Sequence, residues 1–357
     1  MGQRRFLALD GMRGIAALAV LVIHMGGLPA QVVRGGYLAV DFFFCLSGFV
    51  LAHAYGEGSL GLGAFLRLRA IRLYPLYLVG LVFGIASAVF LGVPARLLAG
   101  TVALSLFFLP TPFAVAGVPD QGGSLYPLDP PAWSLFFEIV ANVVWFAARR
   151  WITGATSILV IALCGALFTA AVLAYGVSSG AYWQNIWGGF ARVFYSFLLG
   201  VLVYRLWRAS AWRPRIPTWL PVVGLLALLA APVNRQIFDP PAVMLAMPVL
   251  VFLGACAAPV GRASATLQQA LGDASYAIYA LHYPVIVLVD RAVSGLPLAH
   301  RSLITTPATI VIVVGGALWL DKVYDLRVRR WLLAATSRPR AVVARGEPAQ
   351  VRADGPP

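Results

Sequence analysis

Residues 155–176 read ATSILVIALCGALFTAAVLAYG, a run of 22 residues without a single charged side chain. An α-helix rises about 1.5 Å per residue, so a run of this length covers the roughly 30 Å hydrocarbon core of a bilayer. Comparable runs recur along the chain, at 14–29, 37–55, 73–92, 132–148, 188–206, 217–233, 241–258, 274–293 and 302–321. The sequence therefore predicts an all-α integral membrane protein with about ten transmembrane helices.

The composition agrees with a protein that lipid surrounds. Of 357 residues, 61% are hydrophobic and 11% are charged, whereas soluble domains carry roughly 45–50% apolar and about 25% charged residues. The net charge of +14 comes from basic residues clustered between the apolar runs, as in the cytoplasmic loops of membrane proteins. We therefore expect the bilayer, and not nucleic acid, as a partner. The three cysteines lie inside apolar runs without metal-like spacing, so we interpret them as packing residues and expect no metal site.

Charge also predicts the topology. A further apolar run at 97–116 is shorter and ends in Leu-Pro-Thr-Pro. If it crossed the membrane, Arg149, Arg150 and the basic cluster in 205–215 would all lie outside, against the positive-inside rule. We therefore expect ten crossings, a re-entrant or shallow segment at 97–116, and an external loop at 117–131. Both termini then face the cytoplasm, and the protein is expected in the inner (plasma) membrane.

The domain organisation is simple. Residues 1–335 are expected to form one transmembrane domain, because no internal repeat interrupts the series of apolar runs. Residues 336–357 are rich in Arg, Pro, Ala and Gly and have few large apolar side chains. Such a composition cannot bury enough surface to fold, so we predict a disordered basic tail in the cytoplasm.

Polar groups inside apolar spans are costly and therefore mark candidate functional residues. The first span has Arg13 near its entry and His24 eleven residues later. Eleven residues of helix measure about 16 Å, half of the hydrocarbon core. This places Arg13 near the cytoplasmic surface and His24 in the outer half of the membrane, where an imidazole is suited to proton exchange.

Two carboxylates are expected at a similar depth. Asp41 lies about one turn from the outer end of its span, and Glu138 lies within 132–148. A buried aspartate normally needs a partner. His24 is the nearest candidate, and a carboxylate that orients an imidazole is a common arrangement for a catalytic base. The sequence therefore predicts one catalytic site made of His24, Asp41 and Glu138.

A basic segment is a candidate phosphate-binding site. Arg69 and Arg72 are three residues apart, so on a helix they share a face. Guanidinium groups on one face can bind phosphates through paired hydrogen bonds. The alternative is an ordinary positive-inside anchor.

Five other side chains could line a substrate pathway. Ser275, Tyr279 and His282 recur at helical spacing on one face, although His282 could equally bond a neighbouring helix. Ser47 could line the pathway or only pack between helices. Trp133 precedes Glu138 in a segment that continues into an apolar span.

Taken together, these residues resemble the membrane-bound acyltransferase 3 family, which O-acylates O-antigens, exopolysaccharides and other glycans. The resemblance covers about residues 6–325 and rests on five motifs in order. They are Leu9-Asp10-Gly11 with Arg13 and His24, Val40-Asp41 through Ser47-Gly48-Phe49, Arg69-x-x-Arg72 before Tyr74-Pro75, Trp133-Ser134-Leu135 with Glu138, and Ser275-Tyr276 with Tyr279, His282 and Pro284. The family often has a second acidic residue after the first, whereas Ile139 follows Glu138 here.

The resemblance implies a ten-helix enzyme that uses cytoplasmic acyl-CoA, with acetyl-CoA as the expected donor and no tightly bound cofactor. Arg13, Arg69 and Arg72 would hold the phosphates of coenzyme A. His24 would then activate a hydroxyl of an extracytoplasmic glycan or lipid-linked sugar, by direct transfer or through an acyl-histidine. Many members append an esterase-like domain, and we expect a stand-alone form here.

Two other classes of function compete with this interpretation. Buried Asp, Glu and His residues also mark proton relays, so a proton-coupled transporter of small molecules is the main alternative. It leaves the cytoplasmic arginine pair unexplained, and the repeat that many transporters carry is missing from the sequence. A membrane scaffold would leave the buried charges unexplained.

Overall fold

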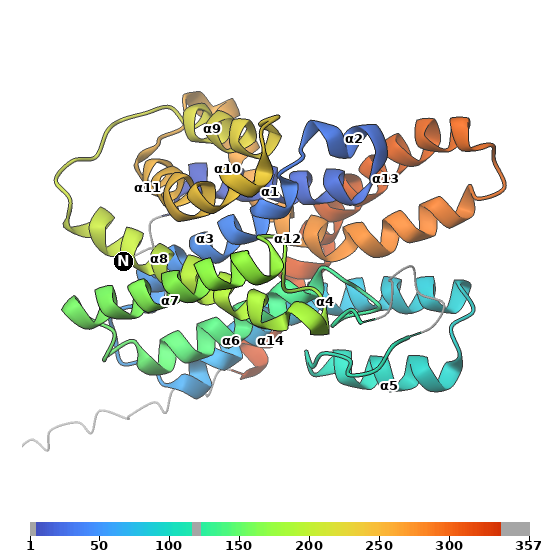
Figure 1. Cartoon of the computed structure of the whole chain (residues 1–357), viewed down its shortest axis with the longest axis horizontal. Coiled ribbons are helices and arrows are strands. Elements are labelled where there is room, and N and C mark those ends of the chain that lie inside the picture. The colour runs from blue at the N-terminus through green and yellow to red at the C-terminus, as the bar shows by residue number, and fades with distance from the viewer. Residues whose placement is uncertain (1–4, 116–122, 337–357) are drawn as a thin grey trace, which may run out of the picture.

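The computed structural model describes residues 5–115 and 123–336, without the side chains of residues 298–302. Within these residues the chain is all helical and forms no β-strand, which confirms the predicted fold class. Figure 1 shows most of the helices running along the long axis of the molecule. The predicted tail lies outside the described residues except for Thr336.

Most of the helices follow one another with short connections, and the longest connection is that between α5 and α6. The α-helices are α1 Leu7–His24, α2 Gly27–Val32, α3 Ala39–Tyr55, α4 Leu62–Phe90, α5 Ala95–Leu106, α6 Ala132–Ala148, α7 Gly154–Tyr175, α8 Ile186–Ala209, α9 Trp219–Ala230, α10 Arg235–Pro241, α11 Met247–Cys256, α12 Gly261–Ala292, α13 Leu298–Leu320 and α14 Leu326–Thr336. Short 3-10 or π segments are η1 Gly36–Leu38, η2 Trp183–Asn185, η3 Ala242–Ala246 and η4 Asp321–Asp325.

A helix lies at each of the ten ranges that the sequence predicted to span the membrane. Among the described residues, seven helical segments are long and apolar enough to cross a bilayer. Of the remaining candidates, α6 and α9 are shorter than a typical spanning helix of about 20 residues. The long helix α12 carries more polar side chains than the others. The number of ten crossings therefore stays a prediction.

Helix α5 is the part of the 97–116 run that becomes helical. Its 12 residues measure about 18 Å, well short of the hydrocarbon core. It lies beside α4 (Figure 1), where Tyr77 donates a hydrogen bond of 2.8 Å to the carbonyl of Ser105. The basic segment with Arg69 and Arg72 belongs to α4, which begins at Leu62 instead of residue 73 as its span predicted.

Helices α1 and α12 pack closely and in parallel, and glycines make the approach possible. A Cβ on Gly14 would lie 2.6 Å from the carbonyl oxygen of Leu271, and one on Gly272 would lie 2.5 Å from Cβ of Asp10. Only hydrogen fits at these positions, so larger residues would push the two helices apart. The contact fixes which residues of α12 face Arg13 and His24.

Candidate active site

A cavity of about 450 Å³ is enclosed by α1, α3, α4, α6 and α12 together with the segment of η4 and α14. It is lined by equal numbers of arginine and carboxylate side chains. The basic ones are Arg5, Arg13, Arg69, Arg72 and Arg329, and the acidic ones are Asp10, Glu138, Asp273, Asp321 and Asp325. The three arginines that the sequence singled out therefore come together in one cavity.

Most of these arginines are held by carboxylates. The pairs are Arg5–Asp10 at 2.7 Å, Arg5–Asp273 at 2.6 Å, Arg13–Asp10 at 3.0 Å, Arg69–Glu138 at 2.9 Å and Arg329–Asp325 at 2.5 Å. Although burial opposes it, bonding to two carboxylates holds the pKa of Arg5 above its usual value. Arg72 is exposed and makes no ion pair within the described part of the chain. Its guanidinium is therefore free to bind an anion.

Glu138 is a member of this cavity and not a neighbour of His24. Its Oε1 accepts hydrogen bonds from Arg69 Nη2 at 2.9 Å and from Ser47 Oγ at 2.7 Å. The expectation that Glu138 joins His24 and Asp41 in one cluster is therefore wrong. Ser47, which could have been a packing residue only, lines the cavity and holds the carboxylate.

Asp41 is also separate from His24. Its two oxygens accept hydrogen bonds from Arg192, 2.6 Å from Nη2 and 3.2 Å from Nε, and both side chains are almost fully buried. Arg192 also donates to the carbonyl of Ser179 at 2.7 Å. The predicted Asp41–His24 pair is therefore wrong, because a buried arginine on α8 occupies the carboxylate. The signal in the sequence was Arg192, an arginine near the start of the apolar run 188–206 and far from the basic cluster at its end.

Arg13 connects the cavity to α12. Its Nε donates to Ser275 Oγ at 2.8 Å, and its Nη2 donates to the carbonyl of Gly272 at 2.8 Å. Ser275 and Tyr279 both line the cavity, and their part in a substrate pathway stays a prediction. Trp133 does not line it. Its indole packs against Phe44 with ring centroids 6.5 Å apart, and the Arg192 guanidinium lies 5.4 Å from its ring.

Tyr279 lies at the cavity end of a row of three side chains, two from α12 and one from α1. Its hydroxyl is 2.6 Å from Ser134 Oγ and donates to the carbonyl of Pro131 at 3.0 Å. Its ring centroid is 5.6 Å from that of His282, which is fully buried. His282 in turn lies 5.0 Å from the ring of His24. The row therefore leads from the cavity to His24.

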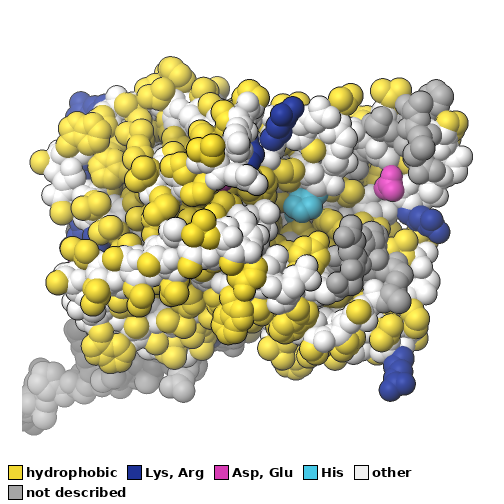
Figure 2. Space-filling model, viewed as in Figure 1, with side chains coloured by type: hydrophobic (Ala, Val, Ile, Leu, Met, Phe, Trp, Pro, Cys, Tyr) yellow, Lys and Arg dark blue, Asp and Glu magenta, His cyan; other side chains and the backbone are white. Residues whose placement is uncertain are grey.

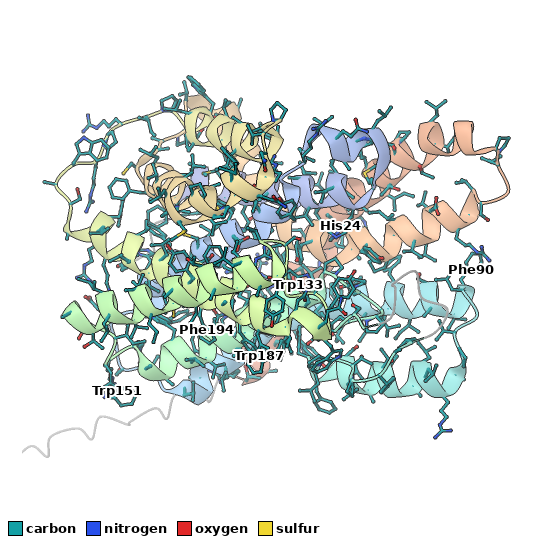
Figure 3. The ribbon with its side chains drawn as sticks, viewed as in Figure 1. His24, Phe90, Trp133, Trp151, Trp187 and Phe194 are labelled. Atoms are coloured by element: carbon teal, nitrogen blue, oxygen red, sulfur yellow. The ribbon has the colours of Figure 1, made fainter. Side chains whose placement is uncertain are left out.

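His24 ends α1 and is exposed. Figure 3 places it on the broad side of the molecule, and Figure 2 shows a histidine at the surface there. Its Nδ1 lies 2.8 Å from the carbonyl of Val20. Because a carbonyl only accepts, Nδ1 carries the hydrogen and Nε2 keeps its lone pair in the neutral ring. His24 thus presents a base on the side away from the arginine cavity.

Asp129 is a buried carboxyl that the sequence analysis missed. It lies in the loop before α6 and is 4% exposed, and its Oδ1 has no hydrogen-bond partner among the described residues. Burial raises the pKa of this carboxyl to about 8. An aspartate between a leucine and two prolines is typical of a turn, so the local sequence did not predict that Asp129 is buried.

Fold and site together define a class of protein. It is a helical membrane protein with a cavity lined by arginines and carboxylates at one end of α1 and an exposed histidine at the other end. A family model described as an acyltransferase domain, that of the acyltransferase 3 family, matches residues 6–320. The chain belongs to this family and is a membrane O-acyltransferase.

Curated relatives agree with the family assignment. The chain is 40% identical to protein 2 in the picA locus of Rhizobium radiobacter over 47% of its length and 94% of the relative. It is 28% identical to the acyltransferase MdmB of Streptomyces mycarofaciens, over 82% of the chain and 81% of the relative. It is 23% identical to the peptidoglycan O-acetyltransferase OatA of Listeria monocytogenes, over 85% of the chain and 53% of the relative. No solved structure matches the chain significantly.

Proposed function

We propose that this acyltransferase moves an acyl group, in particular acetyl, from cytoplasmic acyl-CoA to a hydroxyl of an extracytoplasmic glycan or glycolipid. The observation that carries the proposal is the continuous row from the arginine cavity through Tyr279 and His282 to His24. Donor and acceptor would approach this row from its two ends. The names of relatives such as OatA support an acetyl group and a glycan acceptor.

The chemistry of the cavity suits coenzyme A. Its diphosphate and 3′-phosphate are anions that guanidinium groups bind through charge-assisted hydrogen bonds. Arg72 is available for this directly. Arg69 and Arg13 are held in place by Glu138 and Asp10, so little side-chain entropy is lost when they bind a phosphate. The thin pantetheine arm would then extend past Tyr279 towards the histidines.

The chemistry of transfer falls to His24. Its Nε2 lone pair would take the proton of an acceptor hydroxyl while the oxygen attacks the thioester carbonyl. Attack by Nε2 itself would give an acyl-histidine first, and the same nitrogen serves both routes. Asp41 and Glu138 are left out of this step, because each is bound to an arginine.

The test uses the purified full-length chain in lipid nanodiscs. With radiolabelled acetyl-CoA we expect label to appear in a lipid-linked glycan acceptor, with one free coenzyme A thiol per acetyl group transferred. His24→Ala should abolish both signals while the protein stays folded and membrane-inserted. Uptake of a solute into liposomes without release of thiol would favour the transporter instead, and near-normal acylation by His24→Ala would remove this histidine from the mechanism.

The proposed orientation places both termini in the cytoplasm of a cell whose plasma membrane holds the protein. Gln184 lies between α7 and α8, and Ser210 lies just after α8, and we expect them on opposite sides of the membrane. A membrane-impermeant thiol reagent on intact cells should label a cysteine at Gln184 and spare one at Ser210. The reverse labelling would invert the topology and place the arginine cavity outside.

A further inference from the structure

His282 is the buried histidine that the reaction described above does not use. It is 0% exposed, and its ring lies 5.0 Å from the ring of His24, tilted by 59°. The parallel packing of α1 against α12 creates this contact. On α1 His24 is ten residues beyond Gly14, and on α12 His282 is eleven residues beyond Leu271, the residue against which Gly14 packs.

Hydrogen bonding fixes the protonation pattern of His282. Its Nδ1 lies 2.7 Å from the carbonyl of Tyr279, so Nδ1 carries the hydrogen and Nε2 keeps a lone pair in the neutral ring. This Nε2 is buried and has no hydrogen-bond partner within the described residues. An unpaired buried acceptor costs stability. Such an atom beside a second histidine therefore calls for a functional explanation.

The order of the side chains assigns different substrates to the two rings. The cavity is lined by Ser275 and Tyr279, and His282 follows on the next turn of α12. A thioester that comes from the cavity therefore meets His282 before His24. An acceptor that comes from the exposed side meets His24 first.

We propose that His24 and His282 form a proton relay, in which His24 is the base for the acceptor hydroxyl and His282 is the acid for the departing thiolate. This inference rests on the proposed acyl transfer. The acceptor oxygen forms a bond to the carbonyl carbon, and its proton goes to Nε2 of His24. That proton passes to Nε2 of His282 and then to sulfur as the carbon–sulfur bond breaks. The products are the ester and the free thiol, and both rings return to neutral.

Two variants of His282 test the relay. His282→Asn keeps an N–H that can donate to the Tyr279 carbonyl and loses the basic Nε2. His282→Gln places an amide near the Nε2 position, which can accept a hydrogen bond but cannot carry a proton. With acetyl-CoA, we expect both variants to lose at least about 10²-fold in kcat, the usual contribution of a proton-transfer group. The KM for acetyl-CoA and the melting temperature should stay at their wild-type values.

The leaving group provides the second measurement. The acetyl thioester of nitrothiophenol releases a thiolate that needs no proton to depart. On this donor the His282 variants should work close to the wild-type rate, whereas His24→Asn should fail with both donors.

Wild-type kcat for the His282 variants with acetyl-CoA would overturn the relay. So would full activity in His282→Gln alone, or equal losses on both donors together with a lowered melting temperature. If the wild-type chain transfers no acetyl group at all, the proposed function itself fails.

Discussion

Arg69 and Ser47 donate to the same oxygen of Glu138, at 2.9 and 2.7 Å, so this carboxylate sets the position of a guanidinium in the arginine cavity. Arg69 and Glu138 are largely buried, with side-chain exposures of 12% and 16%. In such surroundings an ion pair with satisfied hydrogen bonds holds a side chain in one place. Under the proposed function, Glu138 would therefore act on donor binding through Arg69, and not on the chemistry at His24.

Glu138→Gln should raise the KM for acyl-CoA about tenfold, which corresponds to about 1.4 kcal/mol. The amide keeps a hydrogen-bond acceptor but loses the charge that orients Arg69. The kcat should change little, because the thioester and His24 are untouched. Steady-state kinetics in nanodiscs measure both values. Glu57→Gln is the matched control, since Glu57 pairs with Arg208 in an exposed position outside the cavity. If Glu138→Gln lowers kcat and leaves KM unchanged, Glu138 takes part in the catalytic step and not in donor binding.

Arg72 offers the cleanest test of the donor cavity. It has no ion-pair partner within the described residues, so its removal leaves no carboxylate unpaired. Arg72→Ala should weaken acyl-CoA binding by roughly 1.5–3 kcal/mol, the usual range for hydrogen bonds to charged groups. Titration of the protein with a non-hydrolysable acyl-CoA analogue measures the effect.

The control for Arg72 is Arg67→Ala. Arg67 belongs to the same helix but does not line the cavity. If Arg72→Ala binds the acyl-CoA analogue with unchanged affinity, the basic segment of α4 only sets the membrane topology and does not bind the donor.

The Asp41–Arg192 pair predicts a loss of stability when one partner is removed. Both side chains are nearly inaccessible, at 0% and 2% exposure. Asp41→Asn leaves a buried guanidinium without its counter-charge, which typically costs 3–5 kcal/mol. The double variant Asp41→Leu with Arg192→Met should recover part of this stability, because an apolar pair needs no desolvated charges.

Thermal unfolding in detergent, with activity measured on the folded fraction, separates stability from catalysis. The double variant should retain acyl transfer per folded molecule. A stable but inactive Asp41→Asn protein would instead make Asp41 a catalytic residue.

Local pattern was enough to predict the helices and which neighbouring residues share a helix face. Apolar length predicts a helix, and spacing of three or four residues predicts a shared face, so Arg69 with Arg72 and Ser275 with Tyr279 could be read from sequence. Depth alone could not say which charges meet. The sequence places Asp41 and His24 at a similar depth and so suggests a pair. The actual partner of Asp41 depends on how α3 packs on α8, because α8 carries Arg192.

Asp129 leads to a prediction about pH and stability. Burial raises the pKa of its carboxyl from 3.8 to about 8, so the native state holds a proton that the unfolded state has lost between these values. In this window the native state binds more protons, and stability must therefore fall as pH rises. The loss begins above the unfolded value and is complete once pH passes the folded value of about 8.

Asp129→Asn imitates the protonated carboxyl and removes this titration. We expect the variant to unfold at a higher temperature than the wild type, by a difference that is smaller at pH 5 and grows up to pH 8. Melting of both proteins in the same detergent, between pH 5 and pH 8.5, measures the difference. Other groups that titrate in this range cancel in the comparison, because they are present in both chains. Parallel melting curves at all pH values would mean that Asp129 is charged in the native state and has found a partner.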